Sequence, residues 1–217
     1  MIGAILLAAG ASTRMGSPKQ LLRWGDTTLI EWEIRELNCA GIVRPIVVLG
    51  DNSSQISKVI SGLDCTIVVN SEWQQGRATS LSAGARALLE EVDSNADSYQ
   101  SVVIQNVDQP TTGSIIRLLI TELAVSGAAL VQPEYLDESG FPHGGHPVVL
   151  KGQLLNELQQ VTEEDQGLRQ IVKRHGSQRL NMSYEPIVKL NLNTPDLVSD
   201  ARSLFRLNND SNLDARA

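Results

Sequence analysis

Short aliphatic runs alternate with helix-like segments along most of the chain. The runs are apolar throughout rather than alternating in polarity, which is typical of strands buried on both faces of a parallel sheet; they are 4–7, 46–49, 66–69, 102–104 and 128–131. Thr28 and Glu31 form a capping-box pattern, Gly41 can end that helix, and apolar residues repeat with helical spacing over 81–92 and 115–123. This alternation predicts a doubly wound, mostly parallel, three-layer α/β/α sheet.

The chain has the length and apolar content of one compact domain. It contains 217 residues, of which 41% are hydrophobic and 4% aromatic, enough for an aliphatic core. We expect one domain over 1–207, a long functional loop over the polar stretch 134–145, and a further strand at 147–150. Residues 208–217 are polar without an apolar stripe, which predicts a flexible tail.

The charge balance excludes general electrostatic capture of nucleic acid or membranes. The 18 Lys and Arg residues stand against 25 Asp and Glu residues, a net charge of −7. No apolar run approaches the roughly 20 residues needed to span a bilayer, and the apolar start lacks the basic residues of a signal peptide. Two cysteines fit a reducing compartment. We therefore expect a cytoplasmic protein with no nucleic-acid or membrane partner.

The most informative loop follows the first expected strand directly. Residues 7–19 read L-A-A-G-A-S-T-R-M-G-S-P-K, and their small side chains allow backbone N–H groups to approach a ligand. Arg14, Lys19 and Arg23 all precede the first acidic residue, Asp26, so a polyphosphate would meet unpaired cations here. Neither a P-loop nor a dinucleotide fingerprint fits these residues. The alternative is a tight, solvated turn.

This loop resembles the opening pattern L-A-[AG]-G-x-S-x-R-M-G-x-x-K of the MobA-like nucleotidyltransferases. Ala9 is typical of the molybdenum cofactor cytidylyltransferases, whereas the guanylyltransferase branch usually carries glycine there, so the resemblance implies CTP as substrate and a Rossmann-like, GT-A-like fold. It implies that the backbone of Leu7, Ala8, Ala9 and Gly10 holds the base and ribose, and that the triphosphate is bound by Arg14 and Lys19. Lys19 would neutralise charge at the α-phosphate.

A second segment extends the resemblance. Residues 70–81 read N-S-E-W-Q-Q-G-R-A-T-S-L and are similar to the family's N-P-x-W-x-x-G-x-x-x-S-L, which adds Asn70, Gly76 and Ser80 to the implied nucleotide site. Ser80 and Gly84 lie one helical turn apart and could place a small polar face against the base. The alternative is ordinary helix capping and close helix packing.

Asp108 is the strongest candidate for a metal ligand. It follows the expected strand 102–104 at its carboxyl end, where open α/β sheets bind ligands, and Mg²⁺ takes one or two carboxylates with substrate phosphates. The resemblance makes Asp108 the magnesium ligand of the family's D-Q-P signature; the alternative is an N-cap near Thr112. In residues 191–196, amides replace both leading acids of the family's D-[IVL]-D-T-P-x-D. Asn193 is therefore a second metal ligand, a residue that positions water or phosphate, or part of a helix cap before Pro195.

Two further segments point to the second substrate. Residues 140–147 resemble the family's G-x-x-x-R-G-H-P with Gly144 in place of the arginine, so His146 is expected to contact the acceptor. His143 and His146 lack a third ligand and the spacing of a zinc site. Arg169 lies in a segment similar to the family's acidic G-x-R, where it would orient the acceptor, unless it is a solvated residue at a helix start.

The resemblance therefore implies a Mg²⁺-dependent cytidylyltransferase. It would transfer CMP from CTP to the terminal phosphate of molybdopterin or the molybdenum cofactor, release pyrophosphate, and pass its product to a client molybdoenzyme, with Lys19, Arg14 and Asp108 as the catalytic set. One alternative changes the reaction to guanylyl transfer or to another phosphomonoester, such as a sugar phosphate. The other is a non-catalytic carrier or insertion factor, prompted by the departures from the family's pattern at Asn191, Asn193 and Gly144.

Overall fold

The computed structural model describes residues 1–13, 15–93 and 96–207. Arg14, a predicted catalytic and nucleotide-binding residue, and the predicted tail 208–217 therefore lie outside the described residues. Among the helices that are described, none is both long and apolar enough to cross a membrane.

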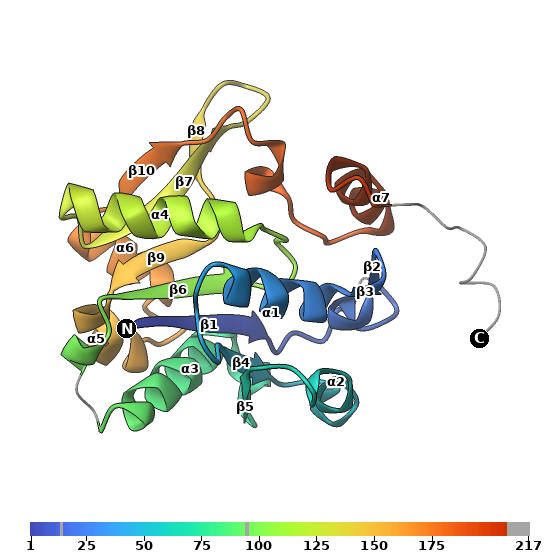
Figure 1. The fold of residues 1–217 in the computed structure, drawn as a ribbon, viewed down its shortest axis with the longest axis horizontal. Coiled ribbons are helices and arrows are strands. Elements are labelled where there is room, and N and C mark those ends of the chain that lie inside the picture. The colour runs from blue at the N-terminus through green and yellow to red at the C-terminus, as the bar shows by residue number, and fades with distance from the viewer. Residues whose placement is uncertain (14, 94–95, 208–217) are drawn as a thin grey trace.

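The centre of the molecule is a mixed, mostly parallel sheet (Figure 1). Its strand order is β10-β7-β9-β6-β1-β4-β5, with β8 paired to β7. Strands β5, β4, β1 and β6 run parallel, whereas β9 is antiparallel to both of its neighbours. The bounds are β1 Ile2–Ala8, β4 Ile46–Leu49, β5 Thr66–Val69, β6 Ser101–Asn106, β7 Leu130–Leu136, β8 Pro142–Gly144, β9 Val148–Lys151 and β10 Gln178–Asn181. The predicted doubly wound sheet is confirmed.

Helices cover both faces of the sheet and enclose two aliphatic cores. One core contains buried residues of α1 Leu29–Cys39, α2 Ser53–Ile60, α4 Gly113–Ser126 and α7 Pro195–Leu204. The other contains those of α3 Arg77–Glu91, α5 Leu155–Gln159 and α6 Leu168–His175. In Figure 1, α1 and α4 lie side by side in front of the sheet. Short 3₁₀ turns occupy Lys19–Leu21, Trp73–Gln75, Ala96–Ser98, Gly152–Leu154 and Pro186–Lys189, and a small hairpin pairs β2 Arg23–Trp24 with β3 Thr27–Thr28.

The first predicted helix has the ends that its sequence indicates. Thr28 is the N-cap of α1 and forms the reciprocal capping box with Glu31. Gly41 follows the last turn with a φ of +91°, a left-handed conformation that glycine adopts without strain. Local capping chemistry therefore determines where this crossover helix begins and ends.

The prediction of a long loop over 134–145 is wrong, because most of this stretch is a β-hairpin. Strand β7 continues to Leu136, and β8 returns antiparallel to it, with Tyr135 opposite His143. The polar residues make the turn, where Asp137 Oδ1 accepts hydrogen bonds from the backbone N–H groups of Ser139 and Phe141. The strand expected at 147–150 is confirmed as β9.

The carboxyl ends of β1, β4 and β6 meet at one edge of the sheet. Backbone hydrogen bonds join the residues beyond these ends: Val107 N–H donates to Leu7 O at 3.1 Å, and Asp51 N–H donates to Ala9 O at 3.2 Å. The loops that follow the three strands are therefore held next to one another, which creates a place for a ligand.

Candidate active site

Three residues from distant parts of the chain meet at this edge. The Lys19 ammonium lies 3.1 Å from Asp108 Oδ2 and 2.7 Å from Asn193 Oδ1. The Lys19 side chain is only 12% exposed, and that of Asp108 is 32% exposed. The predicted phosphate-binding lysine and the two predicted metal ligands thus form a single cluster that solvent reaches from one side.

Gln20, the residue after Lys19, fixes the loop between β1 and Lys19 to the end of β1. Gln20 Nε2 donates to Ala8 O at 2.6 Å and to Gly10 O at 3.0 Å, and Gln20 is 2% exposed. Lys19 N–H donates to Ser12 Oγ at 2.9 Å. Sequence reasoning missed Gln20, although a glutamine that follows the lysine and precedes two leucines was the available signal. Its amide sets the direction in which Lys19 leaves the loop.

A buried carboxyl group supports the loop that carries Asp108. Glu33 on α1 is fully buried and accepts from Gln105 Nε2 at 2.8 Å and from Thr111 N–H at 3.1 Å. Burial raises the pKa of Glu33 well above its usual range, against the hydrogen bonds that Gln105 and Thr111 donate. These contacts hold the residues on either side of Asp108, so the loop presents its carboxylate to Lys19.

Asn193 reaches the cluster because its segment pairs with the Asp108 loop. Leu192 N–H donates to Asp108 O at 2.8 Å, which places the following residue beside Lys19. The capping alternatives are excluded for both residues, since Thr112 is the N-cap of α4 and Thr194 is the N-cap of α7. Asp108 and Asn193 instead direct their side-chain oxygens at the same ammonium group.

A cavity of about 340 Å³ opens beside this cluster. Of the predicted nucleotide-binding residues, those that line it are Leu7, Ala9, Gly10, Lys19, Gly76 and Ser80. Ala8 is not among the lining residues, and its carbonyl is bonded to Gln20. Asn70 lies behind the wall, where its Nδ2 donates to Ser80 Oγ at 3.0 Å. Lining residues that sequence reasoning missed are Ser12, Gln20, Trp73, Gln74, Arg77, Asn106 and Val107.

Gly84 does not share the orientation of Ser80. A Cβ atom on Gly84 would lie 2.5 Å from Ile5 Cγ2 and 3.1 Å from Val48 Cγ2, so this glycine allows α3 to approach the sheet closely. The packing alternative is therefore right for Gly84, and the expectation that it faces the base is wrong. Ser80 alone of this pair lines the cavity.

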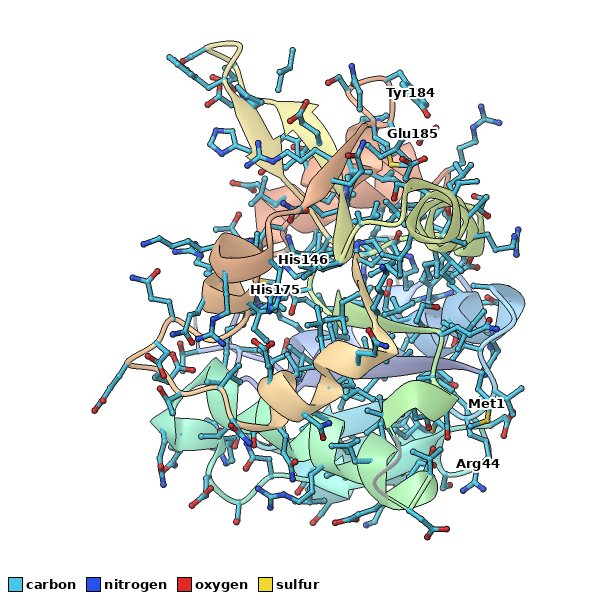
Figure 2. The ribbon with its side chains drawn as sticks, turned by 90° about the vertical axis from the view of Figure 1, so that its left-hand side faces the viewer. Met1, Arg44, His146, His175, Tyr184 and Glu185 are labelled. Atoms are coloured by element: carbon cyan, nitrogen blue, oxygen red, sulfur yellow. The ribbon has the colours of Figure 1, made fainter. Side chains whose placement is uncertain are left out.

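A second cavity of about 730 Å³ adjoins the first and contains both predicted acceptor residues, His146 and Arg169. Burial lowers the pKa of His146 to about 4, and the positive charge of Arg77 acts in the same direction. His146 is therefore neutral near pH 7, and its Nδ1 atom is buried without a hydrogen-bond partner among the described residues. Figure 2 shows His146 near the middle of the molecule, whereas Tyr184 lies at its rim. His146 can offer a hydrogen bond to a ligand but no positive charge.

The second cavity has polar walls from several elements. Arg77, Arg169 and Lys173 contribute positive charge, and the amides of Gln109, Gln132 and Asn191 also line it. A Cβ atom at Gly144 would lie 2.5 Å from Gln132 Nε2. The Gln132 side chain thus occupies the space next to the position where the family pattern carries arginine.

The loop after α5 closes part of this cavity. Glu163 lines it and accepts a hydrogen bond from Ala78 N–H at the start of α3. The donors at that helix end favour a carboxylate. Sequence reasoning missed Glu163 because its contact is made with a segment far away in the chain.

The donor set of the cluster fits a hard divalent cation. Asp108 supplies a carboxylate oxygen and Asn193 an amide oxygen, and both accept a hydrogen bond from the Lys19 ammonium. Mg²⁺ commonly uses one or two protein oxygens together with phosphate and water. Across the described residues, no three His, Cys, Asp or Glu side chains gather as a ready-made metal site.

A doubly wound sheet with a lysine–aspartate pair beside a cavity at its carboxyl edge fits the class of nucleotide-dependent transferases. Residues 4–180 match the family model described as the MobA-like NTP transferase domain. The chain therefore belongs to the MobA-like NTP transferase family.

Three known proteins are similar to this chain. The nicotine blue oxidoreductase of Paenarthrobacter nicotinovorans is 29% identical over 178 residues, which cover 80% of this chain and 82% of that protein. The molybdenum cofactor cytidylyltransferase of Escherichia coli K12 is 28% identical over 152 residues, 69% of each chain. The crystal structure of a Mycobacterium tuberculosis Rv0371c homologue from Mycobacterium sp. strain JC1 is 27% identical, with a TM-score of 0.74 over 95% of this chain and 98% of that one.

Proposed function

We propose that this protein is a Mg²⁺-dependent cytidylyltransferase. It transfers CMP from CTP to the terminal phosphate of molybdopterin, or of its metal-loaded form, and releases pyrophosphate. The observation that carries the proposal is the convergence of Lys19, Asp108 and Asn193 beside the 340 Å³ cavity. Phosphoryl and nucleotidyl transfer depend mainly on positioning and on cations placed where charge develops, and this cluster offers such a cation.

The choice of CTP is supported by Ala9 and by one relative. Ala9 lines the cavity in the position where guanylyltransferases usually carry glycine, and the E. coli relative is named a molybdenum cofactor cytidylyltransferase. Gly10, Trp73 and Ser80 line the same cavity, and residues of these types are suited to a base and ribose.

The roles of the charged residues follow from their contacts. Lys19 would exchange its contact with Asp108 for the α-phosphate, and Arg14 would bind the triphosphate. Asp108 and Asn193, released from Lys19, would hold Mg²⁺ through their side-chain oxygens. Mg²⁺ supplies neutralisation of the phosphate charge when it is bound. A deprotonated phosphate acceptor needs no strong general base. It can attack the α-phosphate directly, so no covalent enzyme intermediate is required.

The second cavity is the proposed site of the acceptor. Arg169 would orient its phosphate, and His146 would donate or accept a hydrogen bond as a neutral imidazole. Gln132 lies beside Gly144 and offers an amide where the family pattern carries a guanidinium. The acceptor would therefore meet an uncharged hydrogen-bonding group there instead of a positive charge.

The test is pyrophosphate release with purified protein, Mg²⁺, each of the four nucleoside triphosphates and a set of acceptors. We expect release with CTP and molybdopterin, and a loss of about 100-fold or more in kcat for Lys19→Ala and Asp108→Ala. Lys58→Ala on α2 and Asp200→Ala on α7 remove exposed charges outside the site and serve as controls.

Other outcomes would identify other functions. Preference for GTP, or turnover only with a sugar phosphate, would contradict the cytidylyltransferase proposal within the same class. Tight binding of the molybdenum cofactor without nucleotidyl transfer would indicate a carrier or insertion factor. Reduction of a coloured substrate without pyrophosphate release would place the protein with the oxidoreductase relative.

A further inference from the structure

Arg77 connects the two cavities. Among the described residues, only Leu7 and Arg77 line both the 340 Å³ cavity and the 730 Å³ cavity. Leu7 is apolar, so Arg77 supplies the charge at the junction between them. The junction is the place where two substrates held in separate cavities would meet.

The guanidinium group of Arg77 is held in place by a short chain of side chains. Arg77 begins α3, and its Nη2 atom donates to Asn106 Oδ1 at 2.7 Å. Asn106 is buried at the end of β6, and its Nδ2 donates in turn to Gln109 Oε1. Because Asn106 and Gln109 lie on either side of Asp108 in the chain, the guanidinium is anchored to the same loop that carries the proposed metal ligand.

Most of the hydrogen-bonding capacity of Arg77 remains available to a ligand. A guanidinium has five N–H donors, and the contact with Asn106 uses one side of it. None of the ion pairs between described residues includes Arg77. Glu163 also reaches the start of α3, but it accepts from Ala78 N–H. A fixed arginine without a carboxylate partner is suited to binding phosphate groups.

The effect of Arg77 on the pKa of His146 supports the position of Arg77 between the two cavities. Arg77 lowers the pKa of His146 and Asp108 raises it, so both charges act on a group in the second cavity. The cation, the proposed metal ligand and the acceptor cavity are therefore close enough to influence one another.

We propose that Arg77 is a further catalytic residue, which contacts the α-phosphate of the nucleotide and the anionic group of the acceptor at once. The inference rests on the proposed nucleotidyl transfer. An acceptor oxygen forms a bond to the α-phosphorus, the bond from that phosphorus to the bridging oxygen breaks, and its electron pair leaves with pyrophosphate. Arg77 moves no proton, and its charge offsets the negative charge that accumulates as the two anions approach. The acceptor class is accordingly a phosphomonoester.

The experiment compares Arg77→Gln, Arg77→Lys and Arg77→Ala with the parent. The assay is pyrophosphate release with CTP, Mg²⁺ and molybdopterin. The matched control is Arg86→Gln, which removes an exposed arginine from the same helix at a position that lines neither cavity. We expect Arg77→Gln to lower kcat by about 100-fold or more, Arg77→Lys to retain more activity than Arg77→Gln, and the melting temperature to stay near that of Arg86→Gln.

Chemical rescue separates a catalytic role from a structural one. We expect guanidinium ion at low, non-denaturing concentration to restore part of the activity of Arg77→Ala, and to leave Arg86→Gln unchanged. If Arg77→Gln is as active as Arg86→Gln, or if the Arg77 variants lose stability with activity and guanidinium restores neither, the inference is wrong while nucleotidyl transfer by the parent still stands. If the parent itself releases no pyrophosphate with any phosphorylated acceptor, the proposed function fails and the inference fails with it.

Discussion

The neutral state of His146 shows how the position of a single side chain determines its chemistry. Burial and the nearby Arg77 lower the pKa of this imidazole to about 4, below the usual value of 6.5. An acceptor phosphate near His146 therefore meets a hydrogen-bonding group, and the positive charge of the second cavity comes from its arginine and lysine side chains.

This shift predicts a pH dependence of folding. Between pH 6.5 and about 4 the unfolded chain protonates His146 and the folded protein does not, so its contribution to stability is present above pH 6.5 and is lost as the pH falls toward 4. We expect the free energy of unfolding of the parent to fall between pH 7 and pH 4.5 by about 1–3 kcal/mol more than that of His146→Asn. Urea titrations at both pH values measure the difference.

His175→Asn provides the comparison for this experiment. His175 is exposed on α6 and pairs with Glu157 Oε1 at 2.9 Å, so it lacks the buried environment of His146. Parallel pH profiles of the parent and His146→Asn would show that His146 is not held neutral by burial.

Residue identity alone could predict some members of the site and not others. Lys19, Asp108 and Asn193 lie in short motifs whose spacing is local, and the structure brings all three together. Gln20 was missed although the residues beside it offered a signal, because its role depends on hydrogen bonds back to Ala8 O and Gly10 O. Arg77 was missed because its partner, Asn106, lies on a strand far away in the chain. The assigned roles of all these residues stay predictions until the variants are assayed.

At the scale of elements, α1 supports the loop that carries Asp108. Trp32 Nε1 donates to Thr111 O at 3.1 Å, Glu33 accepts from Thr111 N–H, and Glu36 Oε2 accepts from Gly113 N–H at 2.6 Å. Consecutive turns of one helix thus hold the whole connection from β6 to α4. The loop has little regular structure of its own, so this support is what keeps the Asp108 carboxylate near Lys19.

Removing the buried carboxyl group should destabilise the protein. Glu33→Leu leaves Thr111 N–H without an acceptor and leaves Gln105 Nε2 with Gln109 O alone, and we expect it to lower the free energy of unfolding by about 2–4 kcal/mol. Glu33→Gln keeps one amide oxygen as an acceptor and should cost less. Chemical denaturation at constant pH measures both changes.

The raised pKa of Glu33 adds a second readout with a definite sign. Above its usual pKa of 4.5 the unfolded chain loses this proton while the folded protein retains it, so the contribution is complete below pH 4.5 and is lost as the pH rises toward the folded-state pKa. The stability advantage of the parent over Glu33→Gln should therefore be larger at pH 5 than at pH 8. An advantage that is constant across this range would refute the assignment of a buried, proton-retaining carboxyl group.

At the scale of the whole molecule, the last described segment is fastened back onto the first hairpin. The Phe205 ring packs edge-to-face on Trp24 and Trp32, with centroid distances of 5.2 and 5.7 Å. Arg202 Nη2 donates to Arg23 O at 2.7 Å. These contacts anchor the carboxyl end of α7, and its amino end follows Asn193. The position of Asn193 in the site therefore depends on packing between the first and the last described segments.

Two truncations test how much of the chain the fold needs. We propose that residues 1–207 form the single domain, so a chain ending at Leu207 should melt at the temperature of the full chain. A chain ending at Leu204 loses Phe205 and Leu207, which both pack against the core, and should be less stable by about 2 kcal/mol, a decrease of about 4–8 °C in melting temperature. Calorimetry on both proteins provides the measurement, and equal melting temperatures for them would contradict the role of these two side chains.

Sequence alone determined the alternation of buried strands and helices, the caps of α1, and the family, because these depend on periodicity and on motifs whose members are close in the chain. The sequence-based prediction of a long loop over 134–145 was wrong. Glycine and polar residues suit a loop and a hairpin turn equally well, and only the pairing of β8 with β7 distinguishes the two. Tertiary structure alone decided that Gly84 faces the sheet, that Glu33 supports the loop of Asp108, and that Arg77 borders both cavities. Each of these depends on contacts between segments distant in sequence, and such contacts are set by how the layers pack rather than by any local pattern.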